Sequence, residues 1–244
     1  MKWIAGVFAV LMLSMGGAQA DQSSSSGKNK QKGQAGEFDY YLLSLSWSPT
    51  FCLTHAGNEQ CKGKGYGFVL HGLWPQYAKG GWPQFCAPLT PLSSAQRQQG
   101  RTLFPTAKLL EHEWNKHGTC SGLGADSYLN TTDQALGKVQ IPEALQPSTS
   151  VREFSAEEIA QLFQQSNPGL PADGIAVGCS GPQLSEVRVC MGKDLRTSAG
   201  TARSVCRRFA EGHLFHGRGR MTPLMLQDRS RQSANDLPQS AAIS

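Results

Sequence analysis

The chain lacks several features that would point to a membrane, metal-binding or strongly polyanionic partner. Beyond its first 20 residues, no apolar run approaches the length of about 20 residues that a membrane-spanning helix needs. Its seven cysteines form no C-x-x-C pair, which argues against a zinc ribbon. No internal repeat is found. The net charge of +5 on 244 residues is too small to identify a partner by its field alone.

The amino terminus is predicted to be an export signal. Residues 1–20 place Lys2 before an apolar run from Trp3 to Met15 and end in small residues, which predicts cleavage after Ala20. Loss of Lys2 leaves 22 basic and 18 acidic residues, a net charge of +4. We therefore expect a mildly basic monomer in the periplasm or the extracellular medium, with no membrane attachment.

Composition divides the mature chain into three parts. Residues 21–36 contain no apolar side chain larger than that of Ala, which predicts a flexible leader. Residues 227–244 are similarly polar and are predicted to be a disordered tail. Residues 37–226 between them are long enough for one domain with its own core.

Seven cysteines in an exported chain indicate a disulfide framework, because the compartment is oxidising. The number is odd, so at least one thiol stays free or pairs between chains. A bridge contributes roughly 2–4 kcal/mol to the free energy of unfolding, so in a chain of this length we expect disulfides to strengthen the fold, not to create it.

Strands and helices are predicted in mixed order. Residues 38–47 alternate apolar side chains at period two, as a half-buried strand does, and further short strands are predicted at 66–71 and 184–190. Helix signals lie at 105–117, ending before Gly118, and at 155–165, where Ser155 and Glu158 form a capping box; another helix is predicted from Asp126 to about Val139. Since no strand-helix-strand unit repeats, the predicted class is α+β, with a largely antiparallel central sheet flanked by helices.

Two segments concentrate the reactive side chains. In the first, FVLHGLWPQ at residues 68–76, the five residues His-Gly-Leu-Trp-Pro would occur by chance about once in ten million start positions. The second, EHEWNKHGTC at residues 111–120, places two imidazoles, a carboxylate and an ammonium within six residues. On a helix, Glu113 and His117 share one face, and His112 and Lys116 lie side by side on the neighbouring one.

This set of groups fits the cleavage of RNA by its own 2′-hydroxyl group. That reaction needs a base for the hydroxyl proton, an acid for the departing 5′-oxygen, and cationic donors for the charged transition state. Histidine serves both proton transfers because its ordinary pKa lies near neutrality. Lys116 supplies positive charge and Glu113 orients or charges a histidine, so no metal or cofactor is required.

The segments HGLWP and H-E-x-x-K-H-G-x-C, in this order, resemble the two active-site segments of the T2 family of secreted ribonucleases. The strand and first cysteine in FDYYLLSLSWSPTFC resemble the opening of that family's domain. The resemblance implies an endoribonuclease of low base specificity that acts on single-stranded RNA and leaves a 2′,3′-cyclic phosphate, which it then hydrolyses to a 3′-phosphate. It assigns these roles by position: acid to His71, base to His117, phosphate binding to His112, transition-state stabilisation to Glu113 and Lys116, and base stacking to Trp74.

The same resemblance implies the pairing of cysteines. It links Cys52 with Cys61 and Cys86 with Cys120, and it leaves three cysteines where the family usually has four. We expect Cys179 to pair with Cys206 and Cys190 to be free, with a Cys190–Cys206 bridge as the alternative. Ser46 and Gln76 stand where family members often carry Gln and an acidic residue, so base preference stays open.

Other interpretations of these residues compete with this one. His112, Glu113 and His117 are similar to the helix of zinc proteases, but their imidazoles are five residues apart where that motif needs four. A secreted zinc hydrolase and a non-catalytic binding module on the same scaffold are therefore the rival classes. Trp74 could also be a core aromatic, and Glu113 and Lys116 alone could be an ordinary charged helix surface.

Overall fold

The computed structural model describes residues 33–150, 152–197 and 224–226. The predicted signal segment, most of the predicted leader, the predicted tail and Cys206 lie outside the described residues. Gly36, the last residue of the predicted leader, donates its N–H to the Cys120 carbonyl at 2.9 Å, so contacts of the domain extend into that segment.

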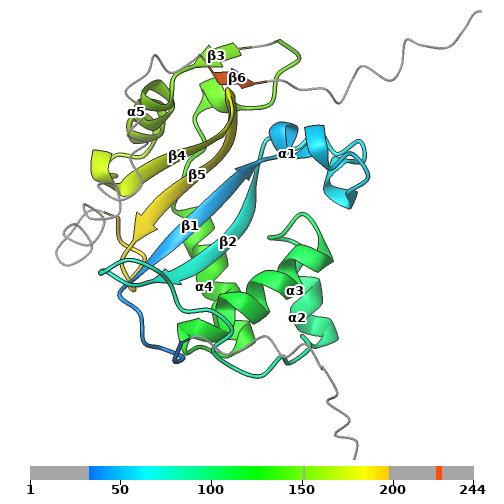
Figure 1. Ribbon diagram of the computed structural model, residues 1–244, viewed down its shortest axis with the longest axis vertical. Helices are drawn as coiled ribbons and strands as arrows, with labels where there is room; N and C mark the ends of the chain where they lie inside the picture. Colours follow the sequence, from blue (N-terminus) through cyan, green and yellow to red (C-terminus); the bar gives the residue numbers. More distant parts are fainter. Residues whose placement is uncertain (1–32, 151, 198–223, 227–244) are drawn as a thin grey trace, which may run out of the picture.

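An antiparallel sheet of four strands forms the centre of the molecule, in the order β2-β1-β5-β4 (Figure 1). Its strands are β1 (Tyr40–Trp47), β2 (Phe68–Gln76), β4 (Ile175–Ser180) and β5 (Gln183–Met191), while β3 (Arg152–Phe154) pairs separately with β6 (Leu224–Leu226). The helices are α1 (Ser48–Thr54), α2 (Ser94–Gly100), α3 (Ala107–Lys116), α4 (Ala125–Gly137) and α5 (Ala156–Ser166). The predicted α+β class with an antiparallel sheet is confirmed.

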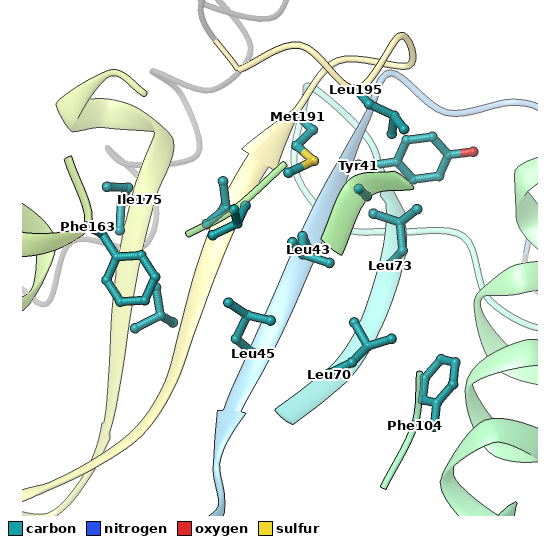
Figure 2. Packing of buried hydrophobic residues seen from close by; sticks show 14 of the residues in the cluster. Tyr41, Leu43, Leu45, Leu70, Leu73, Phe104, Phe163, Ile175, Met191 and Leu195 are labelled. Carbon is teal, nitrogen blue, oxygen red and sulfur yellow. The ribbon is translucent and has the colours of Figure 1, made fainter. Parts of the chain in front are cut away.

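One face of the sheet carries the hydrophobic core. Leu43 and Leu45 of β1 point to the same side as Leu70 and Leu73 of β2, as Figure 2 shows. Buried side chains of α3, α4 and α5 complete this core, among them Leu110, Tyr128, Leu129, Ile159 and Phe163. The prediction of a half-buried strand at 38–47 was wrong in one respect: Tyr40 and Leu42 are also buried, against Cys190, because β1 is a central strand.

A β-bulge interrupts β2 at His71. Leu70 pairs with Leu45 and Gly72 with Ser44, so His71 is the additional residue on its strand. A bulge shifts the period-two alternation by one residue, which lets Leu70 and Leu73 both face the core while His71 and Trp74 point to the other face. The predicted strand ended at His71, but the observed strand continues through the whole segment to Gln76.

The helix that carries the second segment has defined ends. Thr106 caps α3 by accepting the N–H of Leu109 at 3.1 Å, and the helix ends at Lys116, with His117 as its C-cap. The prediction for α5 is confirmed in detail, since Ser155 and Glu158 form the expected capping box. Figure 1 places α3 beside the edge strand β2 and α5 near β4.

Two of the predicted disulfides are present. Cys52 is bonded to Cys61, and Cys86 is bonded to Cys120, which lies just after the reactive segment of α3. The remaining assignment was wrong: Cys179 is free and half-buried, and Cys190 is disulfide-bonded. Both cysteines lie on neighbouring strands, and the sequence offers no local signal that separates them. Within the described residues, no helix is both long and apolar enough to cross a membrane.

Candidate active site

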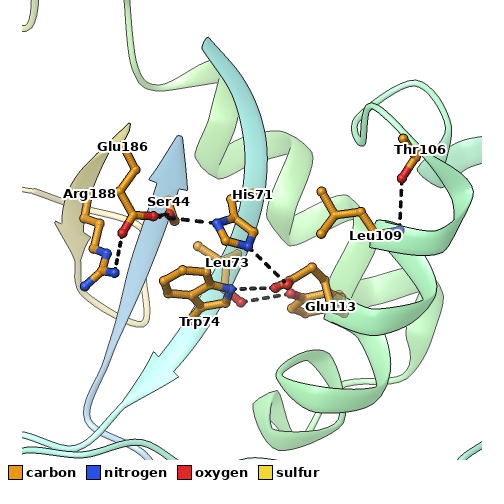
Figure 3. Close-up of polar contacts among 10 residues, drawn as sticks. Ser44, His71, Leu73, Trp74, Thr106, Leu109, Glu113, Glu186 and Arg188 are labelled. Carbon is orange, nitrogen blue, oxygen red and sulfur yellow. Dashed lines mark hydrogen bonds and ion pairs between the residues drawn. The ribbon is translucent and has the colours of Figure 1, made fainter. Parts of the chain in front are cut away.

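The two segments meet where α3 packs beside β2 (Figure 3). The Trp74 indole Nε1–H donates to Glu113 Oε2 at 2.6 Å, and His71 Nε2 lies 3.8 Å from Glu113 Oε1. The His117 ring lies 5.2 Å from the Trp74 ring, centroid to centroid, and the His71 ring lies 5.0 Å away on an edge-to-face contact. Trp74 is thus in contact with both histidines and with the carboxylate.

Gly72 is required for this approach of helix to strand. A Cβ atom at that position would collide with Glu113 Oε2 and with Trp74 Nε1. The glycine between His71 and the tryptophan therefore leaves the space in which the indole and the carboxylate form their hydrogen bond. Any larger residue would displace the Glu113 carboxyl group or the Trp74 indole from this contact.

Glu113 is a buried carboxyl group, with 1% of its side chain exposed. Its pKa is raised overall: burial has the largest effect, because a charge is poorly solvated there, and His71, the Trp74 hydrogen bond and Lys116 offset it only in part. The buried Glu113 carboxyl group is therefore stabilised by His71, Lys116 and the Trp74 N–H. It links β2 to α3 at the centre of the site.

His117 lies in an environment that favours the neutral imidazole. It is 4% exposed, and among the described residues no hydrogen-bond partner reaches its Nδ1 atom. Burial and the positive charges of Lys116, His112 and His71 lower its pKa to about 3. His71, by contrast, is 38% exposed and lies between two carboxyl groups.

His112 and Lys116 lie on the outer part of α3. Burial, Lys116 and His71 together lower the pKa of His112, so the three cationic side chains act on one another. His112 and His71 line one cavity of about 260 Å³, together with Ser46, Phe51, Asn58, Gln60, Val69, Thr106, Lys108 and Leu109. All six predicted site residues are therefore brought to one region of the molecule.

Sequence reasoning missed three further residues on the same face of the sheet. The Ser44 hydroxyl donates to Glu186 Oε2 at 2.9 Å, and Arg188 forms an ion pair with Glu186 Oε1. The same Oε2 atom lies 3.6 Å from His71 Nδ1. The sequence contained a signal for two of them. Glu186 and Arg188 alternate with Val187 and Val189, which indicates that the two charged side chains lie on one face of a strand.

The described residues contain no group of three or more His, Cys, Asp or Glu side chains placed to hold a metal ion. The site is made of imidazole, carboxyl, ammonium and indole groups, of which His71, Trp74, Glu113 and His117 are joined by the contacts described above.

Comparisons of the sequence relate this chain to a family of ribonucleases. The sequence profile of the Ribonuclease T2 family matches residues 38–199. A ribonuclease of Aeromonas hydrophila is 45% identical over 170 residues, which cover 67% of this chain and 76% of that protein.

Comparisons of the fold lead to the same group of proteins. An RNase-related protein from Calystegia sepium has a similar structure, with a TM-score of 0.53 and 26% identity over 67% of this chain and 92% of that one. A point mutant of RNase MC1 in complex with 5′-UMP gives a TM-score of 0.51 and 26% identity, over 66% of this chain and 91% of that one. With its profile, its relatives and its fold in agreement, the chain belongs to the Ribonuclease T2 family.

Proposed function

We propose that the protein is an endoribonuclease that cleaves single-stranded RNA at low base specificity through a 2′,3′-cyclic phosphate and then hydrolyses this product to a 3′-phosphate. One observation carries the proposal: two histidines flank the Trp74–Glu113 pair in environments of opposite character. His117 is buried among positive groups, and His71 lies between carboxyl groups. A proton acceptor and a proton donor for one reaction need this difference.

In the proposed first step, neutral His117 removes the proton of the ribose 2′-hydroxyl group. The 2′-oxygen attacks phosphorus, and the bond from phosphorus to the 5′-oxygen breaks as protonated His71 donates its proton to that oxygen. In the second step water replaces the leaving group, and the two histidines exchange roles. Each proton transfer contributes typically 10²–10⁴ in rate.

The remaining polar groups stabilise charge in this scheme. We assign Lys116 and His112, which lie on α3 near His117, to the phosphate oxygens, whose negative charge grows in the transition state. Glu113 keeps the cationic groups in place and limits their mutual repulsion. Because it transfers no proton itself, we expect its replacement to cost less activity than replacement of either His71 or His117.

The cavity beside His71 offers space for a nucleotide. Its lining combines the aromatic ring of Phe51 with the amides of Asn58 and Gln60, which suits a base without demanding one hydrogen-bond pattern. The half-exposed indole of Trp74 is proposed as a second stacking surface. The complex of RNase MC1 with 5′-UMP supports nucleotide binding on this scaffold.

We also propose that the protein acts as a monomer outside the cytoplasm, after loss of its first twenty residues. Two disulfides in the domain support this location, since such bonds persist in oxidising compartments.

The reaction class is tested by the products and by the sugar requirement. We expect homopolymer RNAs to yield 2′,3′-cyclic phosphate ends first and 3′-phosphate ends later, in excess EDTA, as resolved by chromatography or mass spectrometry. Single-stranded DNA should remain intact because it lacks the attacking hydroxyl group. Cleavage of DNA, or loss of activity with EDTA, would contradict the proposal and favour a metal-dependent hydrolase.

The proposed base should stay neutral in the free protein down to acidic pH. With the pKa of His117 lowered to about 3, its imidazole NMR signals should not titrate between pH 8 and pH 5. The signals are assigned by their absence from the His117→Asn variant. A midpoint near the ordinary value of about 6.5 would show that burial and neighbouring charge do not control this ring.

Trp74 is proposed to act through both its N–H group and its ring, and two variants separate these contributions. Trp74→Phe keeps a ring but removes the donor to Glu113, so kcat should fall about tenfold or more, since a hydrogen bond to a charged group contributes about 1.5–3 kcal/mol. Trp74→Ala should in addition raise KM for polymeric RNA. Steady-state kinetics give kcat and KM of both variants, and thermal melting shows whether they are folded. A Trp74→Phe variant with wild-type kcat would show that the hydrogen bond to Glu113 has no role in the reaction.

A further inference from the structure

Glu186 of β5 lies on the side of His71 opposite to Glu113, and the proposed reaction assigns it no role. His71 Nδ1 is 3.6 Å from Glu186 Oε2, while His71 Nε2 is 3.8 Å from Glu113 Oε1 (Figure 3). The two ring nitrogens therefore face two different carboxyl groups from two different elements. Contacts at both ring nitrogens fix the orientation of the imidazole. The hydrogen bond made by Nδ1 determines whether Nε2 carries the proton that it can donate or accept.

We propose that Glu186 is the positioning residue of His71: it accepts the Nδ1–H of the ring and so directs the Nε2–H towards the departing 5′-oxygen. This inference rests on the proposed ribonuclease reaction. In unliganded sites such contacts are often longer than in the complex with substrate, so a distance of 3.6 Å between His71 Nδ1 and Glu186 Oε2 is compatible with a hydrogen bond that forms when RNA binds.

The carboxylate is itself fixed on both oxygens. Ser44 on β1 donates to Oε2 at 2.9 Å, and Arg188, two residues along β5, pairs with Oε1. Glu186 is 16% exposed. Burial raises its pKa, but the contact with His71, the charge of Arg188 and the Ser44 hydroxyl outweigh that effect and lower the pKa to about 2. The group is therefore a carboxylate at neutral and mildly acidic pH.

The sheet leaves room for this arrangement. Glu186 pairs with Ser46 on one side and with Gly178 on the other, both small residues. A Cβ atom on Gly178 would lie 3.0 Å from Glu186 Cγ, closer than ordinary packing allows. The glutamate side chain thus reaches along the sheet surface, across Ser44, to the bulged His71.

An ion pair with Arg188 alone does not account for the geometry. That pair uses Oε1, whereas the second oxygen is shared by the Ser44 hydroxyl and the His71 ring. Arg188 in turn lies over the Trp74 ring, 5.5 Å from its centroid. Glu186 consequently joins the guanidinium group, the hydroxyl group and the imidazole into one connected set beside the indole.

The Glu186 carboxylate also places a negative charge 3.6 Å from the ring that the proposed reaction uses as its acid. Several titratable or charged groups surround His71 and act on it together: Glu186 and Arg188 from β5, and His112, Glu113, Lys116 and His117 from α3 and its C-cap. A change at Glu186 leaves the groups of α3 in place.

The test measures kcat and KM of the full mature chain on single-stranded RNA from pH 4 to pH 9. In Glu186→Gln, kcat at neutral pH should fall on the order of tenfold while KM stays within about twofold. The basic limb of the pH profile should move down by about one pH unit, because the variant lacks a negative charge beside the acid. Activity should recover as the pH is lowered. Glu186→Ala loses the acceptor as well as the charge, so its kcat should stay low at every pH.

Glu157→Gln, on the exposed side of α5, is the control with the same change of charge, and thermal melting accompanies each variant. A variant of which a smaller fraction is folded would lose activity by the same factor at every pH, and the basic limb of its pH profile would stay in place. A Glu186→Gln profile that superimposes on wild type, or is only scaled down, overturns the inference, provided that His71→Ala is inactive. If His71→Ala retains wild-type activity, the proposed reaction itself is wrong. Failure of the Glu186 inference is thus distinguished from failure of the proposed function.

Discussion

A carboxyl group with 1% of its side chain exposed connects the two segments that carry the reactive residues. Glu113 comes from α3, yet its partners, the Trp74 N–H and His71 Nε2, belong to β2. Burying a charge is costly unless such partners compensate for the lost water, so the packing of helix on strand and the placement of the donors depend on one another. The missing side chain of Gly72 makes the approach possible.

The packing of α3 on β2 places the two histidines in different environments. His117 is the buried C-cap of α3, and burial together with the positive charges of Lys116, His112 and His71 lowers its pKa. His71 stands on a bulge at the sheet surface, between Glu113 and Glu186. One imidazole is therefore kept neutral and the other is surrounded by carboxyl groups. The proposed acid and base roles follow from where each residue stands, although the side chains are chemically identical.

The sequence predicted the residues of the site better than their arrangement. The rare His-Gly-Leu-Trp-Pro segment and the clustered groups of the following helix could be identified because their chemistry is local. The bulge at His71 could not, since it depends on pairing with β1, and the predicted strand stopped there. Glu186 and Ser44 join the site only through the order of strands. The free thiol was misassigned to Cys190 for the same reason: pairing of distant cysteines is a property of the whole fold.

The division of labour between His71 and His117 can be measured with an RNA whose scissile 5′-oxygen is replaced by sulfur. A thiolate departs without a proton, so an enzyme that lacks its general acid is no longer impaired on this substrate, whereas one that lacks its base still is. The account predicts that His71→Ala cleaves the sulfur-containing RNA at a rate close to wild type and that His117→Ala does not. Recovery of His117→Ala instead of His71→Ala would contradict the assignment.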